Sequence, residues 1–333
     1  MTGAGQRRWD ELLGGLVSLI PAGAAAVIDG PADSDGPHAR TAADRIIGAL
    51  SAAGLPCTRR PTSGAGYSRA GAPGPEPGAS HSADGNGGRD VVIWLRTAPP
   101  RRGSADGDTD ADIVIDAHDP DWPVIRRVAA PLAGQGPWYL TETRAFFACR
   151  AAGWDTKFGD DMPAYAAAVA EAGIPDGGTV IDVGCGTGRA IPALREAVGP
   201  AGSVFAIDLT PEMLEQARPR CTAARTALVL ADARRLPLAD RAADAVFAAG
   251  LVTHLPDRVA GLAELARVTR TGGRLVLFHP SGRAALAARH GRTLQPDEPL
   301  AAGPLRAATS AAGWELTAYD DAGGRFFALA VRR

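Results

Sequence analysis

The segment Val180-Ile-Asp-Val-Gly-Cys-Gly-Thr-Gly188 is the clearest indication of fold in the second part of this chain. An apolar run leads directly into Gly184, Gly186 and Gly188, and a helical pattern follows over 191–198. Glycines let the backbone turn tightly and approach a ligand closely, and the start of a helix favours negative or electron-rich groups. The stretch therefore predicts a strand, a ligand-binding turn and a helix in succession.

Strand and helix patterns alternate around this turn from about residue 138 to residue 333. Helices are expected near 141–153 and 161–173, and strands at 178–183, 203–208, 227–230, 243–248 and 273–279. Such alternation builds a parallel sheet with helices on both faces. The segments 314–319 and 326–331 flank a turn rich in Asp and Gly and form a hairpin pattern. The last strand is therefore expected to run antiparallel to its neighbour.

Acidic residues follow two of these strands, and a third precedes the glycine turn. Asp208 ends the second strand, twenty residues after Gly188, where an acid can accept both ribose hydroxyls of an adenosine ligand. The turn reads G-x-G-x-G and follows Asp182, which suits a ligand with a cationic amino-acid end better than a dinucleotide. Asp232 and Ala233 end the third strand and can hold the exocyclic amine of adenine. An N-cap role is the alternative for Asp232.

Residues 138–333 resemble a class I S-adenosylmethionine-dependent methyltransferase of the small-molecule type, similar to ubiquinone and menaquinone methyltransferases. The matching segments occur in the family's order and spacing: 180–188, Ala206-Ile-Asp-Leu-Thr-Pro-Glu-Met-Leu214, Ala231-Asp-Ala233, 244–257 and 268–278. The resemblance implies an α/β, Rossmann-like sheet of seven strands with a reversed last strand. It also implies S-adenosylmethionine as cofactor and methyl transfer to a small-molecule acceptor, for example in specialised metabolism.

The resemblance places a set of residues around the cofactor. They are Asp182, Gly184, Cys185, Gly186, Gly188, Asp208, Leu209, Met213, Asp232, Ala233, Ala249 and Gly250. Met213 is expected to pack on the adenine, and Ala248, Ala249 and Gly250 to line the methionine arm. The segment 154–160 resembles the family's N-terminal cap, which closes over the cofactor.

Two histidines are candidates for a general base, which methyl transfer needs only where the acceptor carries a proton. His254 lies six residues after the fourth strand, 243–248, and His279 follows the fifth strand directly. A structural role in the turn His-Leu-Pro-Asp is the alternative for His254. The atom that is methylated stays open. A second interpretation of the whole chain is a catalytically weak cofactor-binding scaffold that acts through its first domain.

The first part of the chain, 1–132, is predicted to be a smaller α/β domain. Short Val- and Ile-rich runs at 24–28, 91–95 and 113–115 indicate buried strands, and 42–53 is helical in pattern. The glycine-rich segment 61–89 cannot bury a core and is expected to be a disordered loop, and 133–137 a linker to the domain 138–333.

The segment 24–36 resembles the opening of P-loop nucleoside kinases of the uridine kinase sort, and 90–96 and 111–125 resemble later strands. A working loop reads G-x-x-x-x-G-K-[ST]. Here Gly30 and Gly36 are one residue too far apart, and Pro37-His38 stand where Lys and Ser or Thr belong. Proline also removes an amide from the phosphate nest. We therefore expect a degenerate, non-catalytic kinase fold.

Composition excludes other classes. The 333 residues carry 35 basic and 37 acidic side chains, so the chain has no excess positive charge that would attract nucleic acid. The sequence also lacks the clusters of aromatic residues that would stack on nucleic-acid bases. No apolar run approaches the length of a membrane span. The four cysteines lie far apart, which predicts no metal site and suits a reducing cytoplasm. The first domain has little core of its own, so it is expected to pack against the methyltransferase domain or against a second copy of the chain.

Overall fold

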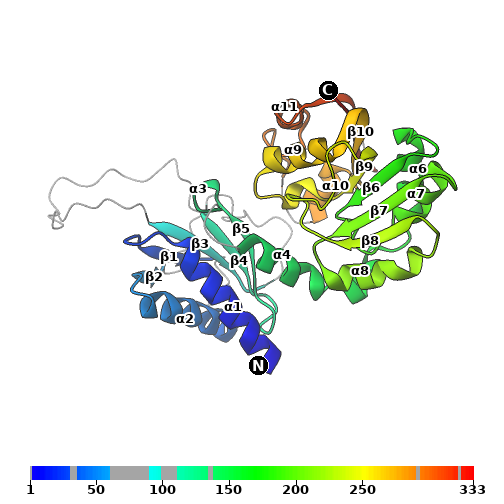
Figure 1. Ribbon diagram of the computed structural model, residues 1–333. Helices are drawn as coiled ribbons and strands as arrows, with labels where there is room; N and C mark the ends of the chain where they lie inside the picture. The colour runs from blue at the N-terminus through cyan, green and yellow to red at the C-terminus, as the bar shows by residue number, and fades with distance from the viewer. Residues whose placement is uncertain are drawn as a thin grey trace. The chain divides into compact units, whose positions relative to one another are not determined.

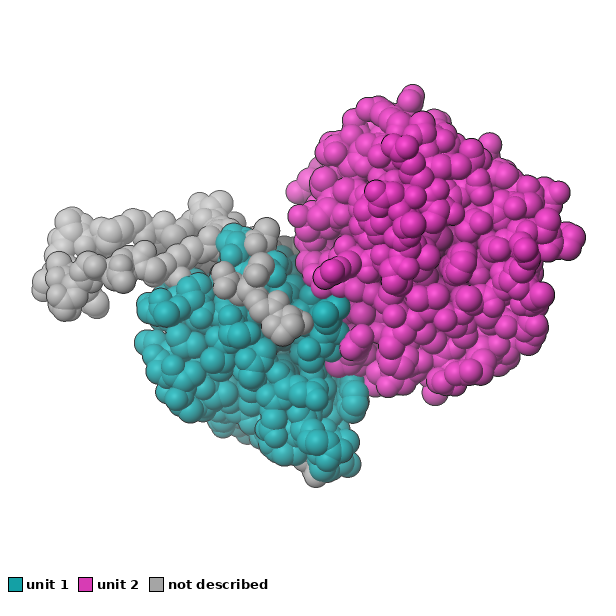
Figure 2. All heavy atoms as spheres, viewed as in Figure 1, with its two compact units in different colours: residues 1–142 teal, residues 143–333 magenta. Residues whose placement is uncertain are grey.

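The computed structural model describes residues 2–30, 36–60, 90–98, 111–133, 138–289, 293–321 and 324–333. Two compact units divide the chain, Met1–Glu142 and Thr143–Arg333 (Figure 2). The predicted loop 61–89 and most of the predicted linker 133–137 lie outside the described residues, so the domain boundary placed there stays a prediction. The division at 142/143 falls within helix α4 (Trp138–Ala148).

The first unit contains a five-stranded sheet in the order β2-β1-β3-β4-β5. Its strands are β1 (Ala26–Asp29), β2 (Cys57–Arg59), β3 (Val91–Arg96), β4 (Ile113–Asp116) and β5 (Val124–Val128). The first four run parallel, and β5 is antiparallel to β4. The sequence pattern predicted β1, β3 and β4 but neither β2 nor β5.

Helices α1 (Gly3–Leu19), α2 (Pro37–Ala52) and α3 (Ala130–Ala133) complete the first unit together with the start of α4 (Figure 1). A buried ion pair joins Arg8 of α1 to Glu142 of α4, and each side chain is 2% exposed. Glu142 also accepts a hydrogen bond from the Ile125 amide at 2.6 Å, so this carboxylate connects α1, α4 and β5. Burial raises the pKa of Glu142, partly offset by Arg8.

The second unit contains the predicted seven-stranded sheet, in the order β11-β12-β10-β9-β6-β7-β8 (Figure 1). Its strands are β6 (Thr179–Val183), β7 (Ser203–Asp208), β8 (Thr226–Leu230), β9 (Ala243–Ala249), β10 (Thr269–His279), β11 (Trp314–Asp320) and β12 (Phe326–Arg332). Strand β12 inserts between β10 and β11 and runs antiparallel to both, while the remaining pairs are parallel. The predicted reversed last strand is thus confirmed.

Helices cover both faces of this sheet. They are α5 (Trp154–Phe158), α6 (Met162–Ala172), α7 (Ile191–Val198), α8 (Pro211–Ala217), α9 (Arg258–Val268), α10 (Arg283–Arg289) and α11 (Ala302–Ala311), with short 3-10 turns at Ala151–Gly153, Arg218–Arg220 and Val252–His254. One apolar core packs α9 and α11 against the sheet, and another packs α6 and α7 against its other face.

The predicted helix 141–153 is interrupted after Ala148. The carbonyl oxygen of Phe146, which a continuing helix would offer to the amide of Arg150, instead accepts the Arg150 guanidinium at 2.7 Å. The Arg150 amide bonds Phe147 in a tighter turn. This change of direction allows Ala151–Gly153 and α5 to form a separate segment before the sheet begins.

The strand order reverses beside β6, the central strand. The chain continues from β6 to β7 on one side, whereas β9 pairs with β6 on the other. In open α/β sheets ligands bind outside the carboxyl ends of the strands at such a switch point. The glycine turn that follows β6 lies at this position, which makes it the candidate ligand-binding site of the second unit.

Candidate active site

The glycine turn is tied to the neighbouring strand β7. The amides of Gly184 and Cys185 both donate to the carbonyl oxygen of Ile207, at 2.8 and 3.0 Å. The Gly186 amide donates to the carboxylate of Asp208 at 2.9 Å. Backbone and side-chain bonds from one strand end therefore fix the path of the turn.

Two of the glycines are required for different reasons. Gly188 has a φ of 81°, and a Cβ there would lie 2.7 Å from Ile191 Cδ1 and 3.1 Å from Ala217 Cβ. Gly186 also has a positive φ, 54°, but a Cβ there would meet nothing within 4 Å. Gly188 thus permits close packing of the helices, whereas Gly186 leaves space above the turn for a ligand.

Asp182 is a buried carboxylate that lacks a complete set of partners. Its side chain is 2% exposed, and Oδ2 has no hydrogen-bond partner among the described residues. Burial, followed by the charge of Asp208, raises the pKa of Asp182 to about 8. A buried polar atom is costly unless it is paired, so this oxygen marks a place where a cationic or donor group of a ligand would be stabilised.

Asp208 is already engaged by the protein backbone. Oδ2 accepts the Gly186 amide, and Oδ1 accepts the Thr210 amide at 2.8 Å. Burial raises the pKa of Asp208, while hydrogen bonds from the Thr210 and Gly186 amides oppose this shift. Each carboxylate oxygen can accept more than one hydrogen bond, so the predicted ribose role is compatible with these contacts.

Asp232 is paired with Arg234. The guanidinium of Arg234 lies 2.8 and 3.0 Å from Oδ2 of Asp232, and the Arg234 amide donates to Oδ1 at 2.9 Å. No helix begins here, so the N-cap alternative for Asp232 does not describe its contacts. Ala233, beside it, is 9% exposed.

The other predicted cofactor residues lie at the same edge of the sheet. Met213 is fully buried on α8, and Cys185 is 8% exposed within the turn. The carbonyl oxygen of Leu209 accepts the Arg144 guanidinium at 3.0 Å. Ala249 ends β9, and Gly250 follows it with a φ of 70°.

His279 lies beside Gly250, since a Cβ on that glycine would be 3.8 Å from His279 Cδ2. Nδ1 of His279 is 3.0 Å from the Ser281 amide and 3.1 Å from the Ser281 carbonyl oxygen. An amide can only donate, so the first contact needs an unprotonated Nδ1 and the second a protonated one. The imidazole orientation is therefore held in either tautomer, and only in the second is Nε2 the unprotonated nitrogen, as a base requires.

His254 occupies a different environment. It ends the 3-10 turn Val252–His254, and its ring meets Phe147 edge to face, with centroids 5.2 Å apart. Phe147 in turn lies 5.7 Å from Trp154 at the start of α5. His254 thus belongs to a half-buried aromatic cluster of Phe147, Trp154 and His254.

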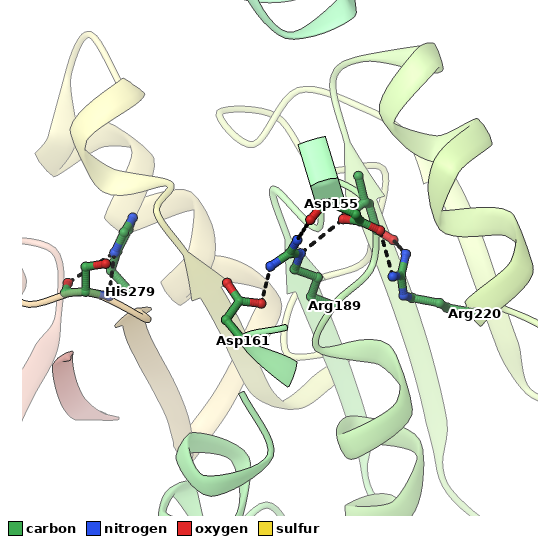
Figure 3. A network of polar contacts seen from close by, with 7 residues as sticks. Asp155, Asp161, Arg189, Arg220 and His279 are labelled. Carbon is green, nitrogen blue, oxygen red and sulfur yellow. Dashed lines mark hydrogen bonds and ion pairs between the residues drawn. The ribbon is translucent and has the colours of Figure 1, made fainter. Parts of the chain in front are cut away.

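A polar network that sequence reasoning missed ties α5 to the glycine turn (Figure 3). Asp155 accepts hydrogen bonds from Thr187 Oγ1 at 2.6 Å, Arg189 Nε at 3.1 Å and Arg220 Nη2 at 2.7 Å. Arg189, 5% exposed, also pairs with Asp161. Burial acts to raise the pKa of Asp155, but these hydrogen bonds outweigh it and lower the pKa.

Among the described residues, no group of three or more His, Cys, Asp or Glu side chains is arranged to hold a metal ion. Within the same parts of the chain, no helix has the length and apolar character needed to cross a bilayer.

Residues 181–277 match the family model described as a methyltransferase domain. This match confirms the predicted enzyme class for the glycine turn and the strands that follow it. S-adenosylmethionine is the methyl donor of the class that the sequence analysis identified, and the buried Asp182 and the open space at Gly186 fit such a ligand.

Two curated proteins and one solved structure illustrate the similarity. An uncharacterized 37.1 kDa protein in a transposon of Streptomyces fradiae is 41% identical over 105 residues, which is 31% of this chain and 30% of that protein. The ubiquinone/menaquinone biosynthesis C-methyltransferase of Burkholderia mallei is 34% identical over 112 residues, 33% of this chain and 46% of that enzyme. The chain thus spans less than half of the length of either relative.

The solved structure is an S-adenosylmethionine-dependent methyltransferase from Aquifex aeolicus. It aligns with 57% of this chain and 98% of its own at 22% identity, with a TM-score of 0.45.

Proposed function

We propose that the second unit binds S-adenosylmethionine at the glycine turn and catalyses methyl transfer to a small-molecule acceptor. The observation that carries this proposal is the buried Asp182 carboxylate, which lacks a partner for Oδ2 directly before a turn that is open at Gly186. In this assignment Asp182 stabilises the ammonium group of the ligand, Asp208 the ribose hydroxyls and Asp232 the adenine amine.

The sulfonium of the bound cofactor supplies a methyl group whose transfer is already downhill. The protein therefore mainly has to align the acceptor and, where the acceptor carries a proton, to remove that proton. His279 is our first candidate for the base. It lies beside Gly250, and the Ser281 carbonyl oxygen can accept from Nδ1 and so hold the tautomer in which Nε2 is unprotonated.

For the first unit we propose a role without phosphoryl transfer. Pro37 begins α2, so the amide that a phosphate nest needs is missing there. The His38 imidazole, which stands where a lysine would contact phosphates, lies 2.6 Å from the carbonyl oxygen of Ala117. The segment 31–35 within the kinase-like loop lies outside the described residues.

Calorimetry with S-adenosylhomocysteine tests the cofactor assignment, with NAD as the competing ligand. We expect a Kd in the micromolar range for S-adenosylhomocysteine, about −7 to −8 kcal/mol, and weaker or no binding of NAD. Tighter binding of NAD would overturn the ligand class. Release of S-adenosylhomocysteine in a screen of phenol, amine, thiol and carbon-acid acceptors then tests catalysis. Binding without turnover on any of them would favour the scaffold alternative.

A further inference from the structure

Asp155 stands where the glycine turn meets α5. Its carboxylate accepts the hydroxyl of Thr187, the residue between Gly186 and Gly188, and that threonine is 2% exposed. Arg220 binds both partners, since it donates to Asp155 at 2.7 Å and to the Thr187 carbonyl oxygen at 2.9 Å. The two residues are therefore joined directly and through a shared cation.

Two carboxylates consequently hold the glycine turn, and they bind neighbouring residues of it. Asp208 accepts the Gly186 amide, and Asp155 accepts the Thr187 hydroxyl. A ligand that bonds to Asp208 and fills the space at Gly186 acts on the same short piece of backbone that Asp155 holds. The contact between Thr187 and Asp155 at 2.6 Å therefore joins the ligand side of the turn to α5.

The position of Asp155 also affects the aromatic cluster of Phe147, Trp154 and His254. Trp154 precedes Asp155 in α5 and packs 5.7 Å from Phe147, whose ring meets His254. Fixing Asp155 therefore also fixes the backbone that carries Trp154. Arg189 strengthens this anchor, because it donates to the Asp155 side chain and to its carbonyl oxygen at 3.2 Å.

We propose that Asp155 is a positioning residue that couples occupation of the cofactor site to the order of α5 and of the aromatic cluster. This inference rests on the proposed function, since it assumes that an adenosine ligand binds at the turn. Asp155 has no direct role in methyl transfer. It acts through Thr187, Arg189 and Arg220.

The test is hydrogen exchange of the full-length protein with and without S-adenosylhomocysteine, combined with calorimetry. The variant is Asp155→Asn, which removes the charge and preserves the size. The matched control is Glu315→Gln, which changes an exposed acid on β11 that lies outside the network and outside the segment 154–160. In the wild-type protein and the control, the ligand should slow exchange both in the turn, 184–188, and in α5, by about tenfold.

In Asp155→Asn we expect protection of the turn to persist while protection of α5 is lost, with S-adenosylhomocysteine bound about tenfold more weakly. Equal protection of α5 in Asp155→Asn and wild type would overturn the inference. Absence of ligand binding to the wild-type protein would instead overturn the proposed function on which it rests. The two failures are therefore distinguishable.

A double-mutant cycle covers the case in which Asp155→Asn folds poorly. Thr187→Val removes the hydroxyl donor and keeps the side-chain shape. If the contact between Thr187 and Asp155 carries the coupling, Thr187→Val alone should weaken protection of α5, and the double variant should be no worse than the more severe single variant. Fully additive losses would contradict a shared path.

Discussion

Asp182 should make cofactor affinity depend on pH. Burial and the charge of Asp208 raise its pKa to about 8, so at pH 6 only about one molecule in a hundred carries the ionised carboxylate before ligand binds. An ammonium group of the ligand is stabilised by the ionised form only. Binding therefore requires loss of a proton, and affinity should rise with pH.

The expected slope follows from this shift. Between pH 6.0 and 7.5 the ionised fraction grows roughly 20- to 30-fold, equivalent to about 2 kcal/mol, if the pKa falls below 6 in the complex. The α-amino group of the ligand stays protonated over this range, because even a peptide α-amino group has a pKa of about 7.7–8.0, and the neighbouring carboxylate of an amino acid raises it further. Calorimetry should thus show a Kd for S-adenosylhomocysteine that falls by about this factor.

A ligand without the amino-acid end provides the control. 5′-Methylthioadenosine retains the adenosine but has no ammonium group, so its affinity should change by less than about threefold over the same range. It also controls for Asp208, whose pKa is raised by burial and which faces the part that both ligands share. Asp182→Asn should remove the difference between the two ligands. Identical pH profiles for both ligands in the wild-type protein would refute the assignment of Asp182.

The same shift predicts an effect on the ligand-free protein. The pKa of Asp182 in the folded state lies above its unfolded value of 3.8, so the folded state binds more protons between these values. Stability should therefore fall as pH rises from about 4 to about 8. The variant Asp182→Asn has no carboxyl group to ionise and should not lose stability in this way. The melting temperature of the variant minus that of the wild type should therefore be larger at pH 8 than at pH 5. A constant difference would show that Asp182 titrates normally.

Three further predictions concern other residues. Asp208→Ala should weaken S-adenosylhomocysteine by about 1.5–3 kcal/mol, through lost charge-assisted hydrogen bonds, and unchanged affinity in calorimetry would contradict its ribose role. His279→Gln should lower kcat by about 100-fold on an acceptor that carries a proton, with ligand Kd unchanged, whereas His254→Gln should cost less; the reverse order would make His254 the base. The full-length protein should neither bind ATP tightly nor phosphorylate uridine or cytidine, and turnover abolished by Asp29→Ala would disprove this.

The architecture of the second unit could be predicted because its signals are local and periodic. The glycine turn fixes β6 and α7 (Ile191–Val198), and the hairpin pattern near the end fixes the reversed strand. The first unit was predicted less completely. Strand β2 has only three residues, and β5 reads Val-Ile-Arg-Arg-Val, in which two arginines interrupt the apolar pattern. Pairing with a neighbouring strand, not local preference, defines such strands.

The candidate site was predictable only in part, for a related reason. Motif spacing pointed to Asp182, Asp208 and Asp232, since Asp182 precedes the glycine turn and the other two end or follow a strand. It gave no sign of the contact between Asp155 and Thr187, which are 32 residues apart. Nothing in the pattern of either segment distinguishes such a pair from two solvated side chains. Only the turn of the chain after Ala148 brings them together.

The three acids at the sheet edge differ in the partners that the protein already gives them. These differences rank how much each acid should contribute to the free energy of ligand binding. Asp232 pairs with Arg234, and the two side chains are 20% and 34% exposed, so a ligand that binds Asp232 has to displace or share this partly solvated ion pair. Asp208 already accepts the amides of Gly186 and Thr210, so a ligand would add bonds to a carboxylate that has partners. Asp182 is fully buried and has an oxygen without a partner, so a ligand supplies what the protein does not. Above the pKa of Asp182, where its carboxylate is ionised before ligand binds, the largest gain in binding free energy should therefore arise at this residue.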